Sequence, residues 1–360
     1  MTSDSRRRWR WLALGGLTVF SLFLVFLATR AGPPERTVAA ARVTDDLCGV
    51  SGSDQLRNDR ETIEQHVARV TAKTVGRWRT ALLRSADRRQ RAIGLALGNA
   101  EPGSDSRRYA KPGTPANNDL VLLALETNDP AIYALALGQC SENNVDMPAG
   151  PCRRLSLEHW AQIDPDNAVP WMWIASRADK SGDPVRTDEA FSQAAKASRL
   201  DSYVGAMRAL ALNALPPKVT PLEKAVAGAD LISISGLVTP VALVTALCSE
   251  QALQVATRRQ QCSSVANVLA AHGTSTVEVS MAAILGKRLG WPEDEWIALQ
   301  KESDSYRQAP GYPWSKADSS TGFRCGTVLR YDYFIDQLAA HGGSERAAMK
   351  ATIETPRTPF

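Results

Sequence analysis

Apolar residues recur at intervals of three, four and seven along most of this chain, which is the spacing of one face of an α-helix. The clearest run starts after Asp54 and predicts one long helix. Its stripe consists of Leu56, Ile63, Val67, Val70, Thr74, Trp78 and Leu82. No stretch alternates between apolar and polar residues for long enough to indicate a β-strand. We therefore predict an all-α domain over residues 54–360.

Prolines and glycines mark the expected ends of several helices. Residues 101–118 contain three prolines and two glycines, which predicts an irregular loop. Asp129 followed by Pro130 is typical of a helix start. The apolar positions of residues 328–339 predict a last long helix, which Gly342 and Gly343 should end.

One apolar run differs from the rest because it contains no charge at all. Residues 11–29 form nineteen uncharged positions between Arg10 and Arg30, about the length that an α-helix needs to cross a bilayer. Four arginines and a single acid precede the run, which should hold residues 1–10 in the cytoplasm. We expect a single-pass protein of the bacterial inner membrane, with a linker at 30–53 and a periplasmic domain at 54–360.

A cleaved signal peptide is the alternative to an uncleaved anchor. Its apolar region should be about 7–15 residues long and should lead into a small-residue cleavage site. Here the run is longer, and Arg30 lies where small residues would be needed. The sequence therefore favours an anchor that contacts the lipid bilayer.

Composition indicates a folded domain, since 44% of residues are hydrophobic and 22% are charged. The net charge is +4, and residues 1–110 hold 19 Lys/Arg against 11 Asp/Glu. A solvated helix face accounts for most of this local surplus. Nucleic acid is not an expected partner of a chain on the outer side of the membrane.

All six cysteines follow the apolar run, and an even number in an exported chain predicts disulfides. Cys140 and Cys152 flank a segment with the composition of a loop. Cys248 and Cys262 would be about 21 Å apart on one continuous helix, so either the chain turns between them or they do not pair.

The remaining two cysteines, Cys48 and Cys325, pair only by exclusion. Six cysteines allow fifteen pairings, so sequence alone does not fix the connectivity. No Cys-x-x-Cys spacing occurs, so we expect no zinc site and no other metal.

Residues 164–202 resemble one unit of a tetratricopeptide repeat. Trp171 stands early in the first predicted helix, a Gly182-Asp183-Pro184 turn follows, and small residues occur where the two helices should meet. These small residues are Ala175, Ala178, Ala190, Ala194 and Ala197. The unit departs from the repeat in having a longer spacing from Trp171 to Ala190, and Ser202 replaces the closing proline.

This resemblance implies a disulfide-braced stack of helical hairpins, similar to an α-solenoid. Asp129-Pro130 and Asp164-Pro165 share the same boundary pattern, which indicates a degenerate array. An ordinary helical hairpin without repeat ancestry is the alternative. Turn chemistry accounts for Asp164 and Asp166, which flank the proline.

The sequence contains no glycine-rich phosphate loop, no His-Glu-x-x-His and no Gly-x-Ser-x-Gly. We therefore expect no cofactor. The four histidines are dispersed along the chain. They are His66, His159, His272 and His341.

The candidate binding residues are Trp171 and Trp173. On one helix they point about 200° apart, so one should lie in the core while the other lines a partner-binding surface. The alternative is that both are buried between helix pairs.

We expect a protein partner in the cell envelope, so that the chain acts as a scaffold or assembly factor. An envelope enzyme acting on glycan, with carboxylates in a helical groove, is the alternative.

Overall fold

The regular elements of this protein are helices throughout the computed structural model, which describes residues 63–98, 115–140, 150–216, 218–232, 237–308 and 325–354. Within these ranges the all-α prediction is confirmed. The elements are α2 (Ile63–Leu83), α3 (Arg88–Ala96), α4 (Pro115–Thr127), α5 (Pro130–Cys140), η3 (Gly150–Arg154), α6 (Leu157–Ile163), α7 (Ala168–Ser181), α8 (Pro184–Lys196), α9 (Val204–Asn213), α10 (Pro221–Ile232), α11 (Val241–Leu247), η4 (Ala252–Gln254), α12 (Ala256–His272), α13 (Thr276–Leu289), α14 (Glu293–Gln308), α16 (Cys325–Ala340) and α17 (Glu345–Glu354).

The predicted membrane anchor, residues 11–29, lies outside the described residues. So do the linker at 30–53 and Cys48. Among the helices that are described, none combines the length and the apolar character needed to cross a bilayer.

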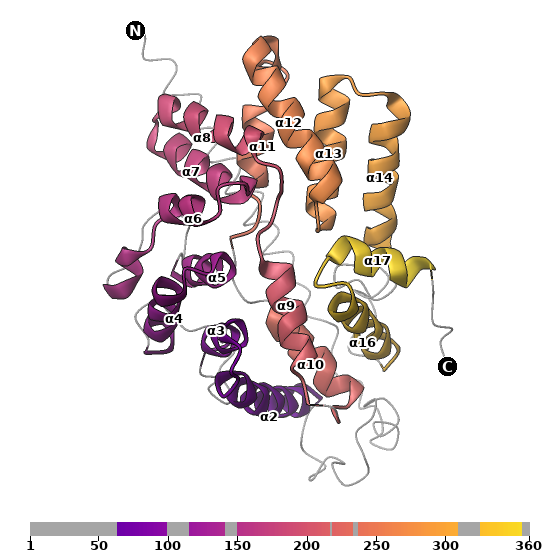
Figure 1. Cartoon of the computed structure of the whole chain (residues 1–360). Helices are drawn as coiled ribbons and strands as arrows, with labels where there is room; N and C mark the ends of the chain where they lie inside the picture. The colour runs from indigo at the N-terminus through magenta and orange to yellow at the C-terminus, as the bar shows by residue number, and fades with distance from the viewer. Residues whose placement is uncertain are drawn as a thin grey trace, which may run out of the picture. The chain divides into compact units, whose positions relative to one another are not determined.

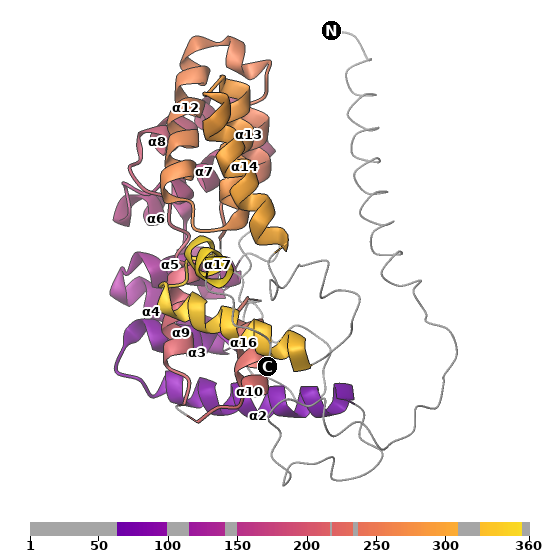
Figure 2. The ribbon, with the colours of Figure 1, turned by 90° about the vertical axis from the view of Figure 1, so that its right-hand side faces the viewer.

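Neighbouring helices pack in pairs along the chain, as Figure 1 shows. The pairs are α2 with α3, α4 with α5, α7 with α8, and α16 with α17, while α12, α13 and α14 lie side by side (Figure 2). This pairing buries the apolar stripes of successive helices against one another. Trp78 and Leu82, from the stripe predicted for α2, are fully buried.

Later helices also pack against the first ones. Helix α9 contacts α3 and α5, α10 contacts α2, and α16 contacts both α9 and α10. A further long-range contact joins α2 to α9, since the indole Nε1 of Trp78 donates to the carbonyl oxygen of Ala211 at 3.0 Å. The hairpins are therefore joined by contacts between residues far apart in the sequence.

Local sequence signals explain most helix starts. Asp129 accepts hydrogen bonds from the backbone N–H groups of Ala131 and Ile132, ahead of α5. Ser275 and Glu278 form a reciprocal capping box at the start of α13. These caps satisfy N–H groups that have no partner inside the helix.

One expected boundary was wrong, and one predicted helix is not the last of the chain. Helix α4 begins at Pro115, inside the stretch that we expected to be irregular, because proline suits the first helical position. Its Asn117 is completely buried. The helix predicted over residues 328–339 is α16, and Gly342 and Gly343 follow its end at Ala340 as expected. It is not the last helix, because α17 follows the glycine pair.

The turn between α16 and α17 makes a close backbone contact with α9. A Cβ atom placed on Gly205 would overlap the carbonyl oxygen of Gly343, and one on Gly343 would overlap the backbone of Gly205. Gly343 also has a φ of +84°, a conformation that favours glycine. Both positions therefore need a residue without a side chain.

A bidentate ion pair joins α17 to α14. Arg346 donates through Nε and Nη2 to the two carboxylate oxygens of Glu302, at 2.6 and 2.8 Å. Its Nη1 also donates to the carbonyl oxygen of Ala270, near the end of α12. Burial disfavours the charged form of Glu302, but hydrogen bonds from Arg346 and Tyr306 outweigh it and lower the pKa of this carboxyl.

Replacing Gly205 with alanine should lower the free energy of unfolding by about 1–3 kcal/mol, because the added methyl meets backbone that cannot rotate away. Gly76→Ala is the matched control, since a Cβ there meets open space within α2; it should raise stability by about 0.5–1 kcal/mol. Urea unfolding followed by circular dichroism measures both. Equal effects of the two substitutions would contradict the close backbone contact.

The Glu302–Arg346 pair should make stability depend on acid pH. Because the pKa of Glu302 is lowered from about 4.5 in the folded state, its contribution is complete above that pH and is lost as the pH falls through the folded pKa. Glu302→Gln should therefore lower the urea midpoint at pH 6.5 more than at pH 3. Glu126→Gln removes an exposed carboxyl and should shift the midpoint little at either pH.

Candidate partner-binding groove on the α7–α8 hairpin

The predicted hairpin at residues 164–202 is present as α7 and α8, and a short turn joins them. Gly182 ends α7 with a left-handed backbone, and its N–H bonds to the last turn of the helix. The Asp183 side chain then accepts a hydrogen bond from Arg186 N, and Pro184 begins α8. Local caps thus define the end of α7 and the start of α8. That this hairpin belongs to a repeat array stays a prediction.

Small side chains fill the contact between the two helices. Ala175 and Ala178 on α7 are buried, as are Ala190 and Ala194 on α8. Their small volume allows the two helix axes to approach closely. The alanine pattern read from the sequence therefore marks buried positions in this hairpin.

A buried polar network closes the open end of the hairpin. Asp164 is only 2% exposed, and its carboxylate accepts hydrogen bonds from the Arg199 guanidinium, from Tyr203 OH at 2.9 Å and from Asn167 Nδ2 at 2.8 Å. Asn167 also exchanges two hydrogen bonds with the backbone of Asp201. The residues before α7 and after α8 are therefore tied together.

This network gives Asp164 a second role beside the turn that the sequence predicts. The turn itself is present, because Asn167 N donates to the carbonyl oxygen of Asp164 at 3.2 Å. Asp166 is exposed, and its backbone oxygen accepts hydrogen bonds from Ser198 N and Arg199 N. Local sequence patterns do not indicate the roles of Arg199 and Tyr203. Oppositely charged residues at the two ends of the unit are the one signal that could have pointed to them.

Tyr203 has an unusual backbone for a residue with a side chain. Its φ is +59°, in the left-handed region, directly before α9. Burial raises the pKa of the Tyr203 phenol above its ordinary value, so the hydroxyl keeps its proton and donates to Asp164. Burial likewise raises the pKa of Asp201, and the hydrogen bond from Tyr203 N opposes that rise.

The two candidate tryptophans have different surroundings, as their opposite directions on α7 predict. Trp173 is 8% exposed, and its Nε1 donates to the carbonyl oxygen of Val238 at 2.9 Å. Trp171 is half-buried, with its Nε1 donating to the carbonyl oxygen of Pro165 at 3.1 Å. Trp173 therefore belongs to the core, and Trp171 reaches the surface.

Trp171 lines an open groove of about 730 Å³ over α6, α7 and α8. Apolar, charged and polar residues all contribute to the groove. Its lining consists of Glu158, Trp171, Ile174, Arg186, Asp188, Glu189, Ala190, Ser192 and Gln193.

Arginines pair with two of the carboxylates in this groove. Glu158 accepts hydrogen bonds from both Arg177 and Arg186, and Asp188 pairs with Arg258 of α12. Glu189 is exposed and has no ion-pair partner among the described residues. A third carboxylate is therefore open to a ligand.

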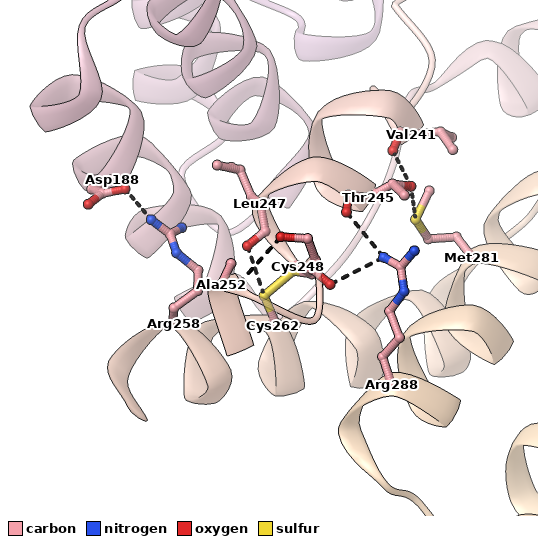
Figure 3. Close-up of a disulfide and its surroundings, with 11 residues drawn as sticks. Asp188, Val241, Thr245, Leu247, Cys248, Ala252, Arg258, Cys262, Met281 and Arg288 are labelled. Carbon is pink, nitrogen blue, oxygen red and sulfur yellow. Dashed lines mark hydrogen bonds and ion pairs between the residues drawn. A yellow bond between two sulfur atoms is a disulfide. The ribbon is translucent and has the colours of Figure 1, made fainter. Parts of the chain in front are cut away.

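The two disulfides with described residues match the predicted pairs. Cys140 pairs with Cys152, with a Cα–Cα distance of 5.7 Å, and Cys248 pairs with Cys262 at 5.8 Å. Figure 3 shows how the second pair forms: the chain turns after α11, which brings Cys248 beside α12. The sequence left two alternatives for Cys248 and Cys262, a turn between them or no pairing, and the structure shows the turn. Cys48–Cys325 stays a prediction.

The histidines do not form a site in the described part of the chain. His159 bonds to the Asn128 side chain at 3.1 Å and packs against the Tyr133 ring. His272 and His341 lie at helix ends, and nothing is described for the side chain of His66. Within the described ranges no group of three or more His, Cys, Asp or Glu residues could hold a metal ion.

Comparison of the chain with protein-family models, with curated proteins and with solved structures finds no match. The groove and its residues are therefore interpreted from their own chemistry.

Asp164→Asn should lower the free energy of unfolding by about 1–3 kcal/mol, because the amide replaces one of the carboxylate oxygens that accept hydrogen bonds in this buried network. Asp166→Asn is the matched control, since that side chain is exposed; it should stay within about 0.5 kcal/mol of the wild type. Urea unfolding at pH 7 tests both. A variant Asp164→Asn as stable as Asp166→Asn would show that the network contributes little.

Proposed function

We propose that this chain is a membrane-anchored periplasmic protein that binds an extended segment of a partner protein in the α7–α8 groove. The observation that carries the proposal is the half-buried Trp171, which offers a large apolar surface beside open carboxylate and amide groups. Tryptophan is enriched among the residues that dominate binding energy at protein interfaces. Residues 164–202, as a tetratricopeptide-like unit, fit the same role.

The charges that line the groove indicate which kind of partner segment it binds. The lining of the groove carries three carboxylates and one arginine, and Glu189 has no ion-pair partner among the described residues. We infer a segment with a Lys or Arg side chain that pairs with Glu189 and contacts the Trp171 ring. A neighbouring apolar side chain of the same segment packs against Ile174. Cation–π and ion-pair contacts then act together on one basic residue.

The cellular location is part of the same proposal. Two disulfides within the described residues support an oxidising compartment. The arginines ahead of residues 11–29 favour a cytoplasmic N-terminus. The groove then lies in the periplasm, where it meets other envelope proteins.

Selection of peptides tests the proposal. Phage-displayed 12-residue peptides are selected on the full chain in neutral detergent, and the enriched peptides are synthesised and titrated against variants. We expect sequences that combine a basic and an apolar residue. Trp171→Ala should weaken their binding about 30-fold, equivalent to about 2 kcal/mol for a dominant interface residue.

Trp296→Ala is the control, since this half-buried tryptophan lies on α14, under the Lys287 ammonium. It should leave peptide binding unchanged. Glu189→Gln should weaken binding of basic peptides only. Peptides that bind equally well to the Trp171→Ala and Trp296→Ala variants would contradict a site in this groove.

A further inference from the structure

A second groove, lined by α12, α13 and the segment around η4, differs from the first in its charge. Its volume is about 560 Å³, and its lining holds three basic residues, Arg259, Lys287 and Arg288, against one acid, Glu250. We call it the basic groove. Leu253, Gln254 and Ile284 complete its lining.

Backbone carbonyls hold the two guanidinium groups in place. Arg288 Nη1 donates to the carbonyl oxygens of Thr245 and Cys248 at 3.1 and 3.2 Å, beside the Cys248–Cys262 disulfide (Figure 3). Arg259 Nη2 donates to the carbonyl oxygen of Leu289 at 2.6 Å. Each contact uses one nitrogen of a guanidinium that has five N–H donors, so further donors stay available.

Lys287 is held in a different way. Its ammonium lies 5.0 Å from the centre of the Trp296 ring, and the side chain is exposed. A contact with an aromatic face orients the ammonium without neutralising its charge.

None of these three cations has a carboxylate partner among the described residues. Other arginines of the fold do have one: Arg258 pairs with Asp188, and Arg346 pairs with Glu302. The carbonyl dipoles that Arg259 and Arg288 contact offset part of the positive charge. A net charge of about two remains on the lining of one groove, because a single acid faces three cations.

We propose that the basic groove binds a phosphate ester. The phosphate would accept hydrogen bonds from Arg259, Lys287 and Arg288, since guanidinium groups match the oxygens of phosphate in a bidentate way. Ile284 is 43% exposed at the same groove and offers an apolar contact to the carbon part of the ester. A soluble phosphomonoester and a phospholipid headgroup share this chemistry.

Calorimetric titration of the full chain in neutral detergent tests the proposal with two probes. They are glycerol 3-phosphate and dihexanoyl phosphatidic acid, a soluble short-chain lipid. Lys287→Gln should weaken binding about tenfold, because one charged donor is lost. Lys73→Gln, which removes an exposed charge from α2, should change nothing. Higher salt should weaken binding in the wild type.

The two probes distinguish the sources of the phosphate. Equal, Lys287-dependent binding of both assigns the site to soluble phosphate esters. Lys287-dependent binding of the lipid alone, weakened by Ile284→Ser, assigns it to a lipid headgroup. The proposal is overturned if neither probe binds, or if Lys287→Gln and Lys73→Gln bind equally. Tighter Lys287-dependent binding of a poly-glutamate peptide would also overturn it, in favour of an acidic protein partner.

Discussion

The carboxylate of Asp164 lies almost completely buried between the segment that enters the α7–α8 hairpin and the segment that leaves it. Burial of a charge is costly unless hydrogen bonds and an opposite charge satisfy it. Here Arg199, Tyr203 and Asn167 do so together. Their geometry fixes the direction in which the chain leaves α8 and enters α9, and α9 in turn contacts α3 and α5. The packing of α9 against the earlier helices therefore depends on the direction in which the chain leaves α8.

The same junction orients the candidate groove. Trp171 is anchored by the carbonyl oxygen of Pro165, the residue that follows Asp164. Trp173, on the opposite side of α7, is anchored by Val238 ahead of α11. One face of α7 therefore carries long-range packing, while the other lines the open groove. A rigid helix with two such faces is suited to presenting a binding residue, because little of it has to become ordered on binding.

Short-range patterns in the sequence predicted the features that they encode directly. Asp129-Pro130 and Gly182-Asp183-Pro184 act within one helical turn of their own positions, and each produces the expected boundary. The loop composition between Cys140 and Cys152 predicted a pair that the structure contains. In the same way, the opposite directions of Trp171 and Trp173 follow from helix geometry alone.

Features that depend on distant partners could not be found in this way. Asp164 makes the turn that its neighbours predict, but its ion pair exists only because the hairpin places Arg199 beside it. Gly342 and Gly343 follow the end of α16 as predicted, but the close contact that requires glycine at position 343 is made by Gly205, which is far away in the sequence. The groove charges have the same origin: whether a lysine or arginine is neutralised depends on which acid the fold brings near it, and a count of charges along the chain does not contain that information.

The hydrogen bond from Trp78 to Ala211 also has a consequence for the order of events during synthesis. The two residues are separated by 133 positions, which a ribosome adds in roughly 7–27 seconds. During that interval α2 and α3 can pair, but the indole N–H that later becomes fully buried has no partner from α9. The α2–α3 hairpin is thus synthesised early but is among the last parts of the described domain to be completed. Its apolar face needs protection from other chains until α9 and α10 are available to cover it.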